Sequence, residues 1–203
     1  MFLRLEEAAF SSQAFQAPIA ASPVEDADPN DIEDLFNVNF FGPILLLQES
    51  IKIFREHGHG LIINISSMAG RFSLPFHGFY SATKFALEAV SESCFLELKD
   101  SGIKVVIIEP GDLDTNFTSS RKVIIKNDSP QQSKFLRALK ITEKDETKGS
   151  HPRVVAKAIY KAINSYNPKL RYRIGKGMGA VNFLHRLIPD KPFLRLIGSH
   201  FKV

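Results

Sequence analysis

Apolar residues recur at helical spacing through residues 31–56, and acidic residues at the start of this stretch suit a helix amino terminus. Pro43 predicts a bend within it. A second helical pattern covers residues 79–98. Two short, mainly apolar runs at 61–65 and 104–109 are typical of strands buried on both faces. The order helix, strand, helix, strand predicts an α/β fold with parallel strands.

The two ends of the chain are less regular. Residues 1–30 contain no glycine and three prolines, and they show no clear secondary-structure pattern. We interpret them as a separate N-terminal segment that precedes one folded unit at 31–203. Residues 117–150 are polar, with a short helical pattern near 135–139, and are interpreted as either a lid or a disordered insertion. A helix is expected over 152–164, and alternating residues at 170–174 predict an edge strand.

Composition excludes several classes of protein. With 203 residues, 44% apolar and 24% charged, the chain suits one globular domain and not a disordered one. A single cysteine, Cys94, excludes an intrachain disulfide and a cysteine zinc cage. His57 and His59 flank a glycine and have no visible third partner, so we expect no metal site. The lack of a signal peptide predicts a cytoplasmic protein.

Charge is distributed unevenly along the chain. The net charge is −7 over residues 1–38, +1 over 39–150 and +10 over 151–203. The basic tail also carries large apolar side chains, so it could contact an anionic membrane surface peripherally, pack over a substrate pocket, or simply be solvated. Nothing resembles a nucleic-acid-binding module, and we expect no nucleic-acid partner.

The chemistry-bearing residues follow the two predicted strands. Ser67 lies just beyond the first strand and thirteen residues before Tyr80, while Pro110 and Gly111 end the second strand. Tyr80 and Lys84 are four residues apart on the predicted helix and share a face. Because ligands of open parallel sheets bind beyond the carboxyl ends of the strands, these residues are expected to meet in one crevice.

A tyrosine beside a lysine suits the interconversion of an alcohol and a carbonyl. The ammonium of Lys84 is expected to lower the pKa of Tyr80, so that the phenol exchanges a proton with the substrate oxygen. A nearby hydroxyl, Ser67, can hold that oxygen as charge develops. No side chain carries hydride, so this chemistry requires a cofactor.

With these residues in this order, the chain resembles the short-chain dehydrogenase/reductase family, most closely over residues 22–117. The resemblance implies that Tyr80 transfers the proton, Ser67 positions the substrate oxygen, and Asn39 holds a water that links Lys84 to solvent. It also implies NAD or NADP as cofactor, without deciding between them. The cofactor-binding residues it implies are Tyr80, Lys84, Pro110, Gly111 and Thr115.

One part of the family pattern is missing. Residues 1–41 contain no glycine, although the family opens with a glycine-rich turn that cradles the pyrophosphate. The Asn-Asn-Ala-Gly of the family is expected near residues 14–17, where this chain has Ala-Phe-Gln-Ala. We therefore expect a partial, N-terminally truncated, Rossmann-like doubly wound parallel sheet that binds the cofactor weakly.

Two functions follow from the resemblance. The first is an NAD(P)-dependent oxidoreductase that acts on a small-molecule carbonyl or alcohol, with a lipophilic substrate suggested by the tail. The second is a catalytically inactive relative that serves as a dimerisation or membrane-surface module. In either case a homo-oligomer is expected to form through the helices at 31–56 and 79–100.

Overall fold

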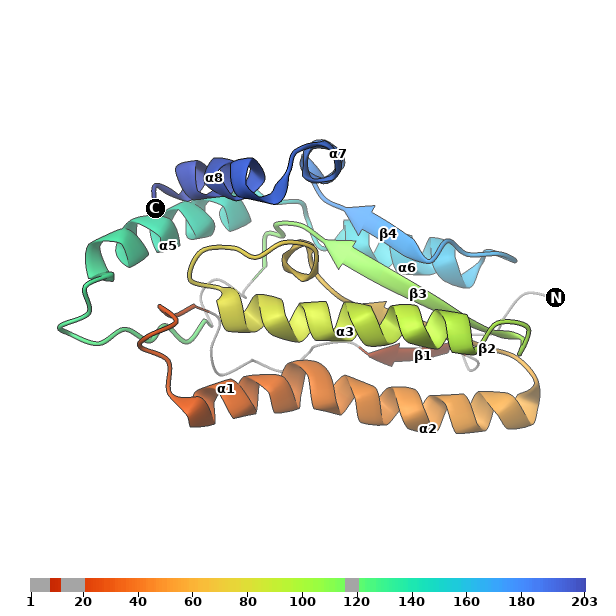
Figure 1. Cartoon of the computed structure of the whole chain (residues 1–203). Coiled ribbons are helices and arrows are strands. Elements are labelled where there is room, and N and C mark those ends of the chain that lie inside the picture. Colours follow the sequence, from red (N-terminus) through yellow and green to blue (C-terminus); the bar gives the residue numbers. More distant parts are fainter. Residues whose placement is uncertain (1–7, 12–20, 116–120) are drawn as a thin grey trace.

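The computed structural model describes residues 8–11, 21–115 and 121–203 (Figure 1). Four strands form one sheet in the order β1-β2-β3-β4, and every neighbouring pair is parallel. Strand β3 pairs with β2 in one register, in which Ile62 lies opposite Val105 and Ile65 lies opposite Ile108. The predicted parallel α/β fold is confirmed. The strands are β1 (Ala8–Ser11), β2 (Gly60–Ile65), β3 (Ile103–Pro110) and β4 (Arg171–Ile174).

Helices cover both faces of this sheet. Alternate strand residues Ile62 and Val105 pack with α2 (Gly42–His57) and α3 (Gly78–Glu97) in one buried cluster. Their neighbours in β2 and β3 face the other way and pack against α6 (Arg153–Ile163). This period of two is what a strand buried on both faces requires. The sheet is therefore doubly wound and Rossmann-like, as predicted.

The long amino-terminal helical region is not one uniform helix. It begins with α1 (Pro29–Phe36), where Asp28 accepts the N–H of Asn30 at 2.8 Å, and continues through a π-helical turn, η2 (Asn37–Phe41), into α2. Pro43 has no N–H to offer the carbonyl four residues earlier. The N–H of Gly42 instead reaches back five residues to the carbonyl of Asn37. The predicted irregularity thus takes the form of a π turn just before the proline.

Three carboxy-terminal helices lie beyond the carboxyl ends of the strands. They are α5 (Gln132–Thr147), α7 (Met178–Leu187) and α8 (Asp190–Phe201), and α5 and α8 run side by side in Figure 1. The imidazole of His200 on α8 lies 2.7 Å from the carboxylate of Asp145 on α5. The helix predicted near 135–139 is part of the longer helix α5. The prediction was too short because the polar residues on either side of 135–139 lie on the exposed faces of α5.

Strand β1 was not predicted, since it lies in the segment without a clear hydrophobic pattern. The sequence Ala-Phe-Gln-Ala at 14–17 lies outside the described residues. The edge strand expected at 170–174 is confirmed as β4, and the helix expected at 152–164 is confirmed as α6. A three-residue 3₁₀ turn, η3 (Met68–Gly70), follows β2 and leads toward α3.

Candidate active site

One cavity of about 990 Å³ opens beyond the carboxyl ends of β2 and β3. Its volume is in the range of small-molecule and cofactor sites. The crevice expected at the ends of the strands is therefore present. Every site residue predicted from the sequence lines this cavity: Asn39, Ser67, Tyr80, Lys84, Pro110, Gly111 and Thr115.

Ser67 and Tyr80 both line this cavity, and the Ser67 hydroxyl is near enough to the phenol of Tyr80 to lower its pKa. Ser67 follows β2 and caps η3, where its Oγ accepts the N–H of Ala69 at 3.1 Å. Tyr80 lies in the first turn of α3, which directs its ring toward the same end of the sheet. The pair can therefore contact one substrate oxygen from two sides.

Burial is the largest influence on the Tyr80 phenol and raises its pKa above the ordinary value, while the nearby Ser67 hydroxyl acts in the opposite direction. The sequence predicted a lowering by Lys84. That prediction is wrong for the structure described here, because burial outweighs the charges nearby. A phenol that stays protonated at neutral pH suits a proton donor.

The side chain of Lys84 is buried, with 1% of its surface exposed. Its Nζ donates to the carbonyl oxygen of Ile65 at 3.0 Å and lies 5.7 Å from the centroid of the Tyr80 ring. Burial lowers the pKa of this amine to about 7, and the nearby Glu88 carboxylate raises it. The amine thus lies between the end of β2 and the catalytic candidate Tyr80.

Asn39 is buried on the π turn η2, and its side chain lines the cavity next to α3. Its Nδ2 donates to Oγ1 of Thr83 at 3.3 Å, and that hydroxyl donates to the carbonyl of Tyr80 at 2.7 Å. These bonds connect the π turn to the first turn of α3. The extra residue of a π turn is a common way of directing a side chain into a site.

Pro110 and Gly111 form the floor of the cavity at the end of β3. The N–H of Gly111 donates to the carbonyl of Ile174 at 2.7 Å, which ties this turn to β4. A side chain at Gly111 would collide with Met178, since an added Cβ would lie 2.7 Å from its sulfur. Thr115 lies farther along the same loop and is exposed at the cavity.

The structure adds an apolar wall that sequence reasoning did not assign. Phe193 on α8 is buried and stacks edge-on against Phe72, with ring centroids 5.1 Å apart. The only signal in the sequence was the apolar character of the tail, which favoured packing over a pocket as one of three readings. The apolar residues that line the cavity from α7 and α8 are Met178, Val181, Leu184, Phe193, Leu196, Ile197 and Phe201.

His77 is a second unassigned residue of the cavity lining. Its Nδ1 lies 2.9 Å from the carbonyl oxygen of Pro75, so this nitrogen carries the hydrogen and donates. Burial lowers the pKa of His77 to about 4. The imidazole is therefore neutral at physiological pH and adds no charge beside Tyr80.

The described residues contain no cluster of three or more His, Cys, Asp or Glu side chains that could hold a metal ion. None of the helices in the described part of the chain is both long and apolar enough to cross a membrane.

The doubly wound sheet and the cavity at its carboxyl edge define an α/β protein of the Rossmann type. Residues 16–123 match the family described as short chain dehydrogenase. The chain therefore belongs to the short-chain dehydrogenase family.

Individual relatives agree with this assignment. The chain is 39% identical over 154 residues to a 3-ketodihydrosphingosine reductase of Bacteroides thetaiotaomicron, covering 75% of this chain and 57% of that protein. A short-chain dehydrogenase structure from Streptomyces avermitilis is 29% identical with a TM-score of 0.70, and the match covers 91% of this chain and 65% of that one. A serine dehydrogenase complexed with NADP+ shares the fold at 20% identity, with a TM-score of 0.67 and coverage of 83% and 64%. The chain thus spans less than two thirds of these relatives.

Proposed function

We propose that this chain carries the catalytic residues of an NAD(P)-dependent oxidoreductase that interconverts a ketone and a secondary alcohol on an apolar molecule. The observation that supports this most directly is the placement of Tyr80 and Ser67 in one cavity, with Lys84 beside the Tyr80 ring. When bound, a nicotinamide cofactor would supply a hydride to the carbonyl carbon or accept one from the alcohol carbon. All other steps belong to the side chains.

In the direction of reduction, Tyr80 donates its phenolic proton to the substrate oxygen as the carbonyl becomes an alcohol. Ser67 accepts the Ala69 N–H, so its own hydrogen remains available to hold the substrate oxygen. In the direction of oxidation, Tyr80 accepts the proton of the alcohol. From the family resemblance we also propose that Asn39 holds a water, through which protons pass between Lys84 and solvent.

The residues present fit the nicotinamide and ribose portion of a dinucleotide. Tyr80 and Lys84 offer donors for ribose hydroxyls, and Thr115 offers a hydroxyl near the Pro110-Gly111 turn. The choice between NAD and NADP is left to experiment. The serine dehydrogenase with the same fold was solved with NADP+.

The apolar wall formed by α7 and α8 supports the proposal of an apolar substrate. Phe193, Leu196 and Ile197 face the cavity near the catalytic candidates, and burying an apolar chain there gains about 25 cal/mol per Å². The 3-ketodihydrosphingosine reductase among the relatives is named for a lipid ketone. We propose that α5, within residues 117–150, and the tail helices α7 and α8 together act as the cover of this pocket.

The test is oxidation of NADH or NADPH by the purified chain, at high cofactor concentration, with a series of ketones of increasing chain length. Tyr80→Phe should abolish turnover, while Tyr160→Phe, on the exposed surface of α6, should leave it unchanged. Rates should increase with the chain length of the ketone. Absence of any Tyr80-dependent turnover would overturn the proposed activity.

We also propose a homodimer through α2 and α3. Both helices pack on one face of the sheet and carry exposed apolar side chains, including Leu46 and Ile53 on α2 and Leu96 on α3. Sedimentation should show a dimer that Leu46→Lys dissociates. Leu136→Lys changes another exposed leucine, on α5, and is the matched control that should leave the dimer intact.

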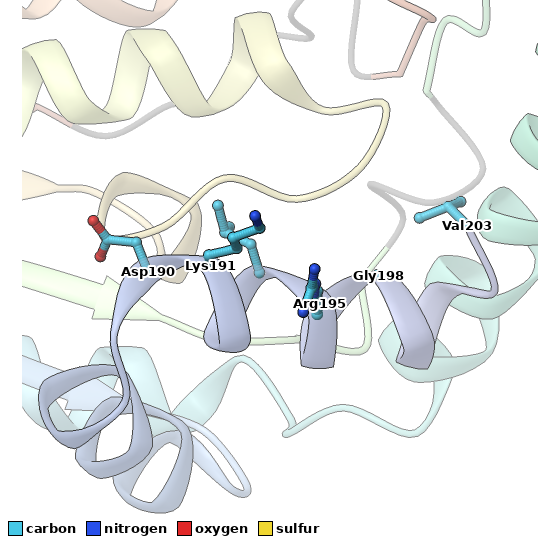
Figure 2. A pocket seen from close by; sticks show the side chains of 6 residues that line it. Asp190, Lys191, Arg195, Gly198 and Val203 are labelled. Carbon is cyan, nitrogen blue, oxygen red and sulfur yellow. The ribbon is translucent and has the colours of Figure 1, made fainter.

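Peripheral contact with an anionic membrane is a separate proposal for α7 and α8. Phe183 and Leu187 are exposed on α7, and Figure 2 shows Lys191 and Arg195 along α8, where they line an open hollow of about 540 Å³. Basic residues beside exposed apolar ones favour anionic lipid surfaces. In vesicle co-sedimentation, Lys191→Glu with Arg195→Glu should abolish a salt-sensitive association.

The matched control makes the same charge change on α6, with Lys157→Glu and Lys161→Glu, and should retain the association. If the two double variants associate with vesicles equally, the basic residues of the tail have no membrane role and are simply solvated.

A further inference from the structure

A chain of charged side chains leads from Lys84 away from the cavity. Glu88 lies one helical turn after Lys84 on α3, and both side chains are buried. Oε2 of Glu88 lies 2.8 Å from a terminal guanidinium nitrogen of Arg171 on β4. Nε of Arg171 lies 2.7 Å from Oε1 of Glu109 on β3, and Nε of Arg173 lies 2.8 Å from Oε2. The edge strand is thereby connected to the helix that carries Tyr80.

Gly70 on η3 allows these groups to approach each other. A Cβ added at this glycine would lie 2.7 Å from Oγ of Ser66, 3.1 Å from Cγ of Glu88 and 3.2 Å from Cβ of Lys84. Only a residue without a side chain leaves room for all three. The backbone of η3 therefore packs Lys84 and Glu88 against the end of β2.

Both charges of the Lys84–Glu88 pair are expensive to bury alone. A buried ion is retained when an opposite charge and hydrogen bonds compensate for its lost hydration. Arg171 supplies this compensation to Glu88, and Glu88 lies on the same helix face as Lys84. The charged groups gathered around the pair are Glu92 on α3, Glu109 on β3, Arg171 and Arg173 on β4, and Arg71 after η3.

We propose that Glu88 is a positioning residue for Lys84: its carboxylate, held by Arg171, compensates the buried ammonium and keeps it protonated at the site. Neither Glu88 nor Arg171 lines the cavity, so both act through Lys84. This inference rests on the proposed role of Lys84. It extends the catalytic machinery to an edge strand that has no contact with substrate.

The directions of the pKa shifts agree with this assignment. Burial lowers the pKa of Lys84 to about 7, and Glu88 is the group that raises it. Burial also raises the pKa of Glu88, while the hydrogen bond from Arg171 and the nearby Ser66 hydroxyl lower it. Arg171 thus favours the ionised carboxylate that Lys84 needs.

The test is a pH titration of the Lys84 side chain by NMR in protein with 13C-labelled lysine, with the signal assigned by its loss in Lys84→Met. Glu88→Gln should move the midpoint to lower pH by about one unit, because the compensating charge is gone. Glu92→Gln is the matched control: Glu92 also contacts Arg171, but its side chain is half exposed, and the midpoint should not move. An unchanged midpoint in Glu88→Gln, or equal shifts in both variants, would overturn the proposal.

A second measurement does not require Glu88→Gln to fold. In wild-type protein with 13C-labelled glutamate, the Glu88 carboxyl signal should show an inflection at the midpoint of Lys84, and Lys84→Met should remove it. A Glu88 signal that does not respond to Lys84 would overturn the proposal. Neither experiment uses cofactor or turnover, so a failure here is distinct from a failure of the proposed activity.

Discussion

Replacing Lys84 with methionine should change how the stability of the protein depends on pH. Burial lowers the pKa of this lysine from 10.5 to about 7, and its side chain is 1% exposed. A depression of this size corresponds to about 5 kcal/mol of cost for the buried ammonium, at 1.36 kcal/mol per unit. Between these two pKa values the unfolded chain binds more protons than the folded one. The free energy of unfolding therefore rises with pH in this window.

From pH 7 to pH 9.5 the contribution of this one group should amount to about 3 kcal/mol. The assay is urea denaturation followed by circular dichroism, since the chain contains no tryptophan. The difference in unfolding free energy, wild type minus Lys84→Met, should increase across this range. Other titrating groups largely cancel in the difference.

Lys140→Met is the control, because Lys140 is exposed on α5 and has no burial cost. Its difference from wild type should stay flat with pH. A flat difference for Lys84→Met as well would refute the reasoning. It would mean that the amine is solvated or fully compensated in the folded protein.

Three further predictions concern packing and cofactor binding. Gly70→Ala should lower the free energy of unfolding by about 1–3 kcal/mol, because the added methyl group overpacks the site. Gly179→Ala should raise the free energy of unfolding by up to about 1 kcal/mol, because Gly179 lies in α7 with open space around an added Cβ. Denaturation curves that rank the two variants the other way would contradict this prediction. Phe193→Ala should lower the free energy of unfolding by about 3–5 kcal/mol, because Phe193 is buried. Leu194→Ala, at the half-exposed neighbouring position, should lower it far less. Equal losses in the two variants would be inconsistent with a tail packed over the cavity. Calorimetry should show weak binding of NAD and NADP by this chain, because residues 1–41 contain no glycine-rich phosphate cradle; tight binding would show that other residues hold the pyrophosphate.

The central part of the fold could be predicted because its signals are local. Strands β2 and β3 are short apolar runs, α3 follows a helical period, and the four-residue spacing of Tyr80 and Lys84 places both on one helix face. The order of elements then brings Ser67 and Pro110 to the same edge of the sheet. These predictions needed only periodicity and the topology of parallel sheets.

The parts that could not be predicted depend on contacts between distant segments. Strand β1 carries no readable pattern, and its place is defined by pairing with β2. The apolar wall over the cavity is formed by tail residues whose sequence equally suits a membrane surface. The raised pKa of Tyr80 follows from burial, which spacing along the chain does not reveal. The same holds for Glu88 and Arg171, which are 83 residues apart.

The π turn at Asn37–Phe41 has a consequence for sequence divergence by insertion and deletion. A π turn accommodates one residue more than the α-helical period, and each residue of an α-helix rotates the chain by about 100°. Deleting one residue within this turn would restore α-helical bonding. It would also move Asn39 or its neighbours off the face that meets α3. Single-residue deletions should therefore be excluded from this turn among active relatives, while substitutions that keep its length are tolerated.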